Sequence, residues 1–366
     1  MLEPDGLKDV DWEPCVLERR PDPALTRYVR REAGMVPDCL DYYSACPWVA
    51  HHFIYWSPTG MPLLTIELSL VEMISLVVAQ DNSCRFCYAA SRTMLRALGY
   101  GDETRRLLEQ DVATAAFAPV TRAAVDFARR LSRANPLPGP EALAPLRASG
   151  LGEQGVREVV YVTALQLIAN RVVTIAAVPI DAVEQLSTRW WIRLLRPVLT
   201  FAVRRARGKL RPAPLPAGMR DGPFAHVVRA FDGHPIGPRL WTQIDEAWRS
   251  DILPRRTKAL IAGVISRALA CPLSESEARR LLAEAGATLD LESVLANLAS
   301  PELTDAEAVI VPFVRDTVYY SPAQIQRRGR VVFERLGQAA FLETVGIAAL
   351  VNALCHMTAV LPDASR

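Results

Sequence analysis

Two cysteines separated by two residues are the feature of this sequence most able to do chemistry. Cys84 and Cys87 lie in DNSCRFCYAAS, residues 81–91, whereas the other cysteines are scattered along the chain. Such a pair can close into a disulfide, with one sulfur attacking a substrate and the other resolving the intermediate. It can also supply two of the four ligands of a zinc ion. Two small sulfur side chains can equally pack a core.

The residues around the pair predict a helix N-terminus. Asn82 and Ser83 are favoured N-cap residues, and a helical pattern begins at Cys84. Cys87 then lies three residues further along, on the same face. Cys84 lies in the first turn, where free amides and the helix dipole favour an anion, so we expect a lowered pKa and a working thiolate for its thiol. Arg85 either adds to this effect or is an ordinary solvated helix residue.

Neither a metal nor a cofactor is expected. Zinc needs four ligands, no second Cys-x-x-Cys exists, and the histidines nearest in sequence are His51 and His52. The chain also contains no nucleotide-binding glycine pattern, phosphate loop or Gly-x-Ser-x-Gly. Redox chemistry at the pair would therefore draw its electrons from an external dithiol or a thiol-carrying protein.

Helices must position these residues, because no segment shows the alternation typical of a strand. Periodic apolar patterns, and breakers such as Pro119 and Gly99, define four segments: 67–80, 84–98, 120–133 and 153–178. The last is apolar enough to suggest a membrane span, but its charged and amide side chains favour a buried helix. The sequence thus predicts an all-α fold.

Length and composition limit the class of protein. A chain of 366 residues suggests two domains. A net charge of +2 provides no global field, so we expect no binding to nucleic acid. Seven irregularly spaced cysteines do not resemble a secreted disulfide framework, and the acidic N-terminus does not resemble a signal peptide. We expect a cytoplasmic protein.

The two halves of the sequence align with each other. Residues 91–100 match 278–287 at an offset of 187, and 150–171 match 335–356 at an offset of 185. Matches that stay in order indicate an ancient duplication. We expect an N-terminal extension (1–24), a first domain (25–186), a basic linker (187–221) and a degenerate second domain (222–362).

The second copy lacks most of the chemistry of the first. At the same offset only Cys271 survives, opposite Cys84, while Ala259, Ser274 and Ala278 replace the other candidate site residues. We therefore expect no dithiol chemistry there, with Cys355 and His356 as packing residues. The second half would supply the surface that a second subunit supplies in a homo-oligomeric relative.

The linker is strongly basic. Residues 185–220 contain nine arginines or lysines and no acid. We expect an inter-domain helix that is split at Pro197 and packs its apolar face, rather than a helix that touches lipid or an acidic partner.

The segment VEMISLVVAQDNSCRFCYAAS, residues 71–91, resembles the alkylhydroperoxidase D / carboxymuconolactone decarboxylase family. Glu72 stands twelve residues before Cys84, as in that family, and residues 34–52 and 164–173 are similar to its entry segment and closing helix. The resemblance implies two tandem helical bundles of this kind, joined by the basic linker helix. It also implies a homo-oligomer, and thiol peroxidase or disulfide reductase activity on a small-molecule peroxide or disulfide.

The resemblance also implies a role for each residue. Cys87 would be the attacking thiolate, Cys84 the resolving thiol and Glu72 the proton acceptor. Ser91 occupies the position of the family histidine, and a hydroxyl cannot hold a proton near neutral pH as imidazole does. Either His51 or His52 replaces it from another helix, or the site is slower or performs different chemistry.

Two alternatives follow from this departure. The first is an enzyme that acts on a small acid or lactone, as carboxymuconolactone decarboxylase-like relatives do. The second is a non-catalytic member of the family.

Overall fold

The computed structural model describes residues 7, 10–110, 117–180 and 194–361, and these residues form helices and no strands. The all-α expectation is confirmed. The first half contains α1 (Pro23–Ala33), η1 (Asp38–Tyr42), α2 (Pro47–Trp56), α3 (Leu68–Asp81), α4 (Arg85–Ala97), α5 (Asp102–Gln110), α6 (Pro119–Ser132), η2 (Pro140–Leu143), α7 (Ala144–Ala148) and α8 (Glu153–Ile175). After it come α10 (Arg196–Arg207), η4 (Ala217–Met219), α11 (Ala225–Arg229), α12 (Ile236–Arg249), α13 (Arg255–Ala268), α14 (Pro272–Glu284), α15 (Leu291–Asn297), α16 (Asp305–Asp316) and α17 (Pro322–Val360).

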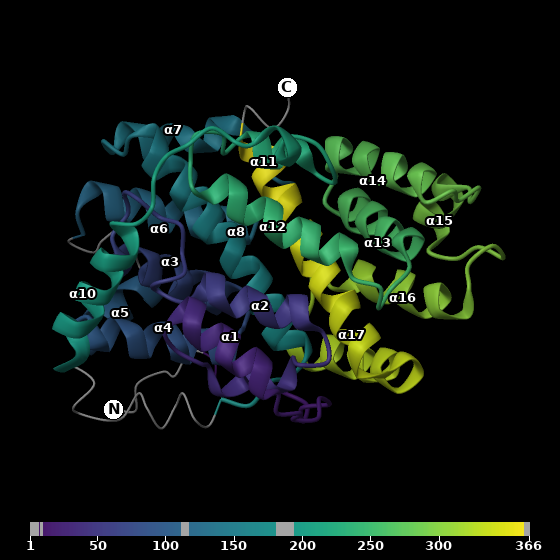
Figure 1. The fold of residues 1–366 in the computed structure, drawn as a ribbon, viewed down its shortest axis with the longest axis horizontal. Coiled ribbons are helices and arrows are strands. Elements are labelled where there is room, and N and C mark those ends of the chain that lie inside the picture. Colours follow the sequence, from purple (N-terminus) through teal and green to yellow (C-terminus); the bar gives the residue numbers. More distant parts are fainter. Residues whose placement is uncertain (1–6, 8–9, 111–116, 181–193, 362–366) are drawn as a thin grey trace.

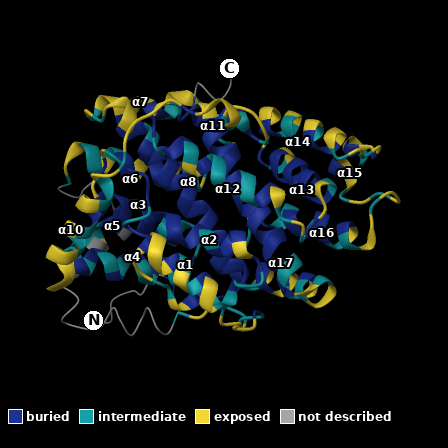
Figure 2. Ribbon diagram, in the orientation of Figure 1, coloured by how far each residue is buried: buried dark blue, intermediate teal, exposed yellow. Residues whose placement is uncertain are grey.

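The helices are arranged around two long central ones. Figure 1 shows α3–α6 at one end of the molecule and α13–α16 at the other, with α8 and α17 between them. Helix α17 is broken at Gly337, where φ is +78°, and its second part packs against α8. Buried residues run continuously through both halves (Figure 2), which therefore share one hydrophobic core.

Matching helices recur at the offsets seen in the sequence. Helices α3 and α4 correspond to α13 and α14, each shifted by 187 residues at both ends. The turn before the second helix recurs as well, with positive φ at Ser83 (52°) and at Ala270 (50°). The glycine after it also has positive φ in both copies, at Gly99 and Gly286. We propose on this basis that segments 25–186 and 222–362 derive from one duplicated unit.

A buried glutamate from each half binds a side chain of the other half. Glu158 of α8 lies 3.1 Å from Nε2 of His234, and Glu343 of α17 accepts a hydrogen bond of 3.2 Å from Nε1 of Trp48. Both pairs are buried. Glu343 also forms an ion pair of 3.1 Å with Lys258, and both of these side chains are fully buried. These crossed contacts fix the two halves against each other.

The hydropathy of the two central helices reflects burial. Helices α8 and α17 are long and apolar enough to cross a membrane, but 100% and 94% of their most apolar windows are buried inside the protein. Contacts with other helices therefore account for the apolar segment 156–178.

The basic linker differs from the expectation. Residues 187–193 lie outside the described part of the chain. Pro197 stands in the first turn of α10, where its missing N–H costs nothing, so it begins a helix and does not split one. Val203 is buried as expected, but Val198 and Phe201 are 65% and 68% exposed. The expected packing of the whole apolar face is therefore wrong for the described part of the linker.

Candidate active site

The two cysteines of the motif meet at the start of α4. The helix begins at Arg85 and its N-cap is Cys84, not Asn82 or Ser83, because Ser83 adopts positive φ in the tight turn after α3. The Cys84 sulfur accepts a hydrogen bond of 3.3 Å from the backbone amide of Cys87, and the two thiols are close enough for Cys84 to affect the pKa of Cys87. All the cysteines are free thiols. The arrangement brings two sulfurs together without a covalent bond.

Burial reverses the expected acidity of the second cysteine. Cys87 is nearly inaccessible to water, and this burial raises the pKa of its thiol well above the ordinary value. The interaction of its thiol with Cys84, and the nearby Cys39, raise this pKa further. The expectation of a resting thiolate is therefore wrong for Cys87. A base is needed before this sulfur can attack.

A buried carboxyl group lies across the helix pair. Glu72 is on α3, which packs along α4, and burial raises its pKa to about 8, while a hydrogen bond from the Ser91 hydroxyl acts in the opposite direction. Ser91 and Cys87 are four residues apart on α4 and so share one face. The structure thus brings Glu72, Ser91 and the cysteine pair to one helix interface.

The histidines do not occupy the place of the family histidine. His51 Nδ1 lies 3.2 Å from the Glu246 carboxylate on α12. His52 is buried among Trp48, Tyr55 and Trp56, and burial lowers its pKa to about 3. His51 contacts α12 and His52 contacts aromatic rings. These contacts do not support the expectation that one of the two histidines replaces Ser91.

Arg85 is directed toward the N-terminal extension. Its Nε donates a hydrogen bond of 3.1 Å to the carbonyl of Leu7, and its guanidinium lies 5.5 Å from the Trp12 ring centroid. These contacts fasten the extension over the motif, a role that neither sequence interpretation of Arg85 included.

Two further residues near the thiols come from distant segments. Arg171 of α8 is buried and donates to Asn82 Oδ1 at 3.4 Å and to the Val318 carbonyl at 3.2 Å. Burial raises the pKa of Tyr320, as do the neighbouring Cys84 and Cys87. Arg171 belongs to the Asn-Arg pair noted in the sequence, whereas Tyr320 lies in the second half and has no sequence signal. The second half therefore helps to enclose the site of the first.

A metal cluster is not visible in the described part of the chain, where no three His, Cys, Asp or Glu side chains converge.

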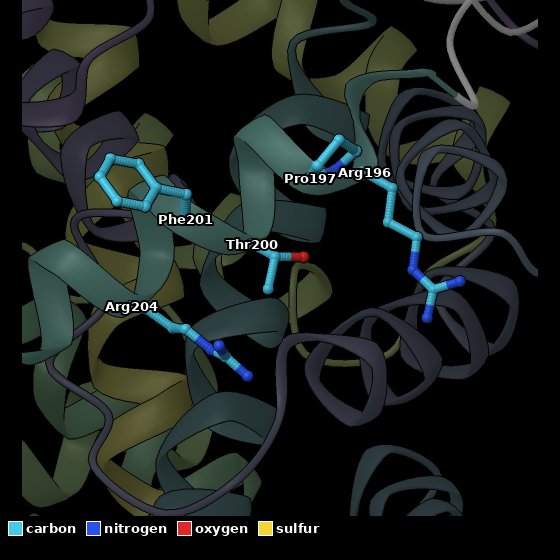
Figure 3. A pocket seen from close by; sticks show the side chains of 5 residues that line it. All are labelled: Arg196, Pro197, Thr200, Phe201 and Arg204. Carbon is cyan, nitrogen blue, oxygen red and sulfur yellow. The ribbon is translucent and has the colours of Figure 1, made fainter.

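A basic hollow lies beside the N-terminal end of α3. It has a volume of about 260 Å³ and is lined by α10 together with the ends of α3 and α4, including Arg196, Arg204 and Arg207. A second hollow, of about 310 Å³, is lined by residues of α10. Figure 3 shows Arg196, Thr200 and Arg204 extending from this helix, while Phe201 points another way. Leu68, on the rim of the first hollow, is one helical turn from Glu72.

Comparison with known proteins identifies a solved structure that is similar to part of this chain. No protein-family model and no curated protein matches the chain. A crystal structure described as an uncharacterized peroxidase-related protein from Silicibacter sp. TM1040 is similar with a TM-score of 0.40 and 22% identity. The match covers 47% of this chain and 94% of that one.

Proposed function

We propose that the protein is a thiol-dependent oxidoreductase that reduces a hydroperoxide or a small disulfide through Cys84 and Cys87. The observation that carries the proposal is the buried Glu72 carboxyl, whose pKa of about 8 suits a proton acceptor near neutral pH. Its hydrogen-bond partner Ser91 is one turn from Cys87.

The chemistry begins with removal of a proton from Cys87. The raised pKa of this thiol means that attack requires a base, and Glu72 supplies one through the Ser91 hydroxyl. Ser91 both donates and accepts hydrogen bonds, so it passes a proton on without holding it.

The thiolate then attacks one peroxide oxygen and the O–O bond breaks. The other oxygen leaves as an alcohol, with the proton that Glu72 received, and Cys87 becomes a sulfenic acid. The Cys84 thiol attacks that sulfur, a disulfide forms and water leaves. An external dithiol reduces the disulfide by exchange and restores both thiols.

A peroxide-consumption assay with dithiothreitol as electron donor tests this function. We expect Cys87→Ser to lower the rate at least tenfold. Cys46→Ser is the matched control, because Cys46, like Cys87, is a buried cysteine at the N-terminal end of a helix. An equal rate in Cys87→Ser and Cys46→Ser would falsify the proposal.

A second candidate function is supported by the basic hollow beside α10. Three arginines, against one carboxylate from Glu67, line a space of about 260 Å³ and suit a small carboxylic acid. Leu68 on its rim is one helical turn from Glu72. Thermal shift with a panel of small carboxylates separates the candidates. Stabilisation that is lost in Arg204→Gln, together with no peroxide consumption, favours the acid-directed enzyme.

A further inference from the structure

Two cysteines of the second half, Cys271 and Cys355, lie on two elements whose counterparts in the first half do not share a cysteine pair between them. Cys271 is the N-cap of α14, the position that Cys84 occupies before α4. Cys355 lies on α17 at the place of Asn170 on α8, by the offset of 185 residues. The sequence gives no reason to connect these cysteines, and it predicts no dithiol chemistry in this half.

The structure brings these two cysteines to the same place in the core. Cys271 Sγ lies 3.2 Å from the hydroxyl of Ser274, and Cys355 Sγ lies 3.6 Å from that of Ser266. Ser266 of α13 links the two residues, because its carbonyl accepts a hydrogen bond of 2.9 Å from the Cys271 amide while its hydroxyl contacts Cys355. The two sulfurs are close enough to change each other's pKa. The expectation that Cys355 is only a packing residue is therefore incomplete.

The surroundings make the two sulfurs unequal. The Cys355 thiol donates to Cys271 and lowers its pKa, and the hydroxyl and amide of Ser274 act in the same direction against the effect of burial. Burial and the neighbouring Cys271 raise the pKa of Cys355. Cys271 is thus the better nucleophile and Cys355 the sulfur that keeps its proton.

We propose that Cys271 and Cys355 form a second redox-active dithiol, which joins α14 to α17 by a disulfide when it is oxidised by a hydroperoxide. The Cys271 thiolate attacks a peroxide oxygen, the O–O bond breaks, and the other oxygen leaves as an alcohol after taking a proton from solvent. Cys355 then attacks the Cys271 sulfenic acid, forms the disulfide and releases water. Two thiols are oxidised, and one hydroperoxide is reduced to alcohol and water.

This pair is distinct from the proposed active site in one important respect. Ala259 occupies the position that Glu72 has in the first half, so no carboxyl group lies at that place to accept a proton. We expect the second pair to be oxidised once per chain and to be reduced slowly, since Cys355 is fully buried and Cys271 is nearly so. Such a bond suits a sensor of oxidation better than a turnover site.

Peptide mapping tests the proposal, and it detects a disulfide in each cysteine pair separately. The native chain and a Cys84→Ser/Cys87→Ser variant are treated with excess hydrogen peroxide, denatured with an alkylating reagent present and digested with trypsin. Residues 268–279 contain only Cys271, and residues 336–366 contain only Cys355. We expect these two peptides to be disulfide-linked in both proteins and separate after reduction. The remaining cysteines should be recovered alkylated in the variant.

A second measurement does not depend on any substitution. Iodoacetamide should modify Cys271 of the unoxidised native chain with a midpoint pH below the ordinary thiol value of about 8.5. Recovery of both peptides unlinked after peroxide treatment, in both proteins, overturns the proposal. The proposal is also overturned if iodoacetamide modifies Cys271 no faster than it modifies Cys39, which is also buried.

Discussion

The Ser91 hydroxyl on α4 lies close enough to the buried Glu72 carboxyl group on α3 to lower its pKa, against the larger effect of burial. A serine hydroxyl does not titrate near neutral pH, so Glu72 is the carboxyl group that titrates in this site. The pH dependence of the protein should therefore follow Glu72. Cys87 contributes in the same sense, because burial keeps its thiol protonated and a rise in pH favours the thiolate that attacks.

Replacement of Glu72 should remove the base. The peroxide-consumption rate of the native chain should rise as pH increases through about 8, because the carboxylate form accepts the proton. Glu72→Gln should lower the rate by about 100-fold and abolish this inflection, since a positioned base contributes about 10²–10⁴. Initial rates from pH 6 to 9 provide the measurement. The same inflection in Glu72→Gln would show that another group titrates.

Stability should depend on pH through the same carboxyl group. Its pKa is about 8 in the folded chain against 4.5 for the ordinary carboxyl, so between these values the unfolded chain has lost a proton that the folded chain retains. The free energy of unfolding should then fall as pH rises from 5 to 8, by about 1.4 kcal/mol for each pH unit at most. Urea denaturation at pH 5 and pH 8 measures the difference.

Two glutamine variants separate this effect from others. Glu72→Gln should show a smaller loss of stability between pH 5 and pH 8 than the native chain does. Glu67→Gln is the matched control, because Glu67 is exposed at the N-cap of the same helix. An equal pH slope in the native chain and in Glu72→Gln would argue against a raised pKa for this group.

Two substitutions at Ser91 should act in opposite directions on the rate. Ser91→Ala removes the hydrogen bond that lowers the Glu72 pKa, so the inflection should move to higher pH. Ser91→His introduces a group that can hold a proton near pH 7 and should raise the rate at that pH by about tenfold or more. The larger side chain in a buried position should cost about 1–3 kcal/mol. Rates that do not change in either variant would exclude Ser91 from the proton path.

The contact between Lys258 and Glu343 should be costly to break from one side. Both side chains are fully buried and 3.1 Å apart. Lys258→Met leaves a buried carboxylate without its cation and should lower the free energy of unfolding by about 3–5 kcal/mol. Lys258→Met/Glu343→Gln should recover part of that loss in urea denaturation. A double variant less stable than the single one would mean that Glu343 acts chiefly through Trp48 and the Leu253 amide.

Local patterns predicted the helices that hold the site. Segments 67–80, 84–98, 120–133 and 153–178 appear as α3, α4, α6 and α8 with ends shifted by at most three residues, because periodicity and breakers act over short distances. The N-cap was misassigned by one or two residues, since Ser83 takes positive φ and the helix starts after Cys84.

What could not be predicted depends on contacts between distant segments. Burial raises the pKa of Cys87, whereas helix position alone suggested a thiolate. Tyr320 reaches the first site from the second half, and Cys355 reaches Cys271 across α14 and α17. None of these meetings leaves a periodic or spaced signal in the sequence, because each is created by packing of the two halves.

The most direct test of the proposed function is a disulfide map of the first cysteine pair. After one equivalent of hydroperoxide, alkylation and digestion by trypsin with a glutamate-specific protease, Cys84 lies in residues 73–85 and Cys87 in residues 86–92. We predict that these two peptides are linked by a disulfide. Treatment of the oxidised native chain with dithiothreitol before digestion should yield them as separate peptides. Recovery of both peptides unlinked, with Cys84 and Cys87 alkylated only after denaturation, would contradict the account and indicate a non-catalytic protein with inert buried thiols.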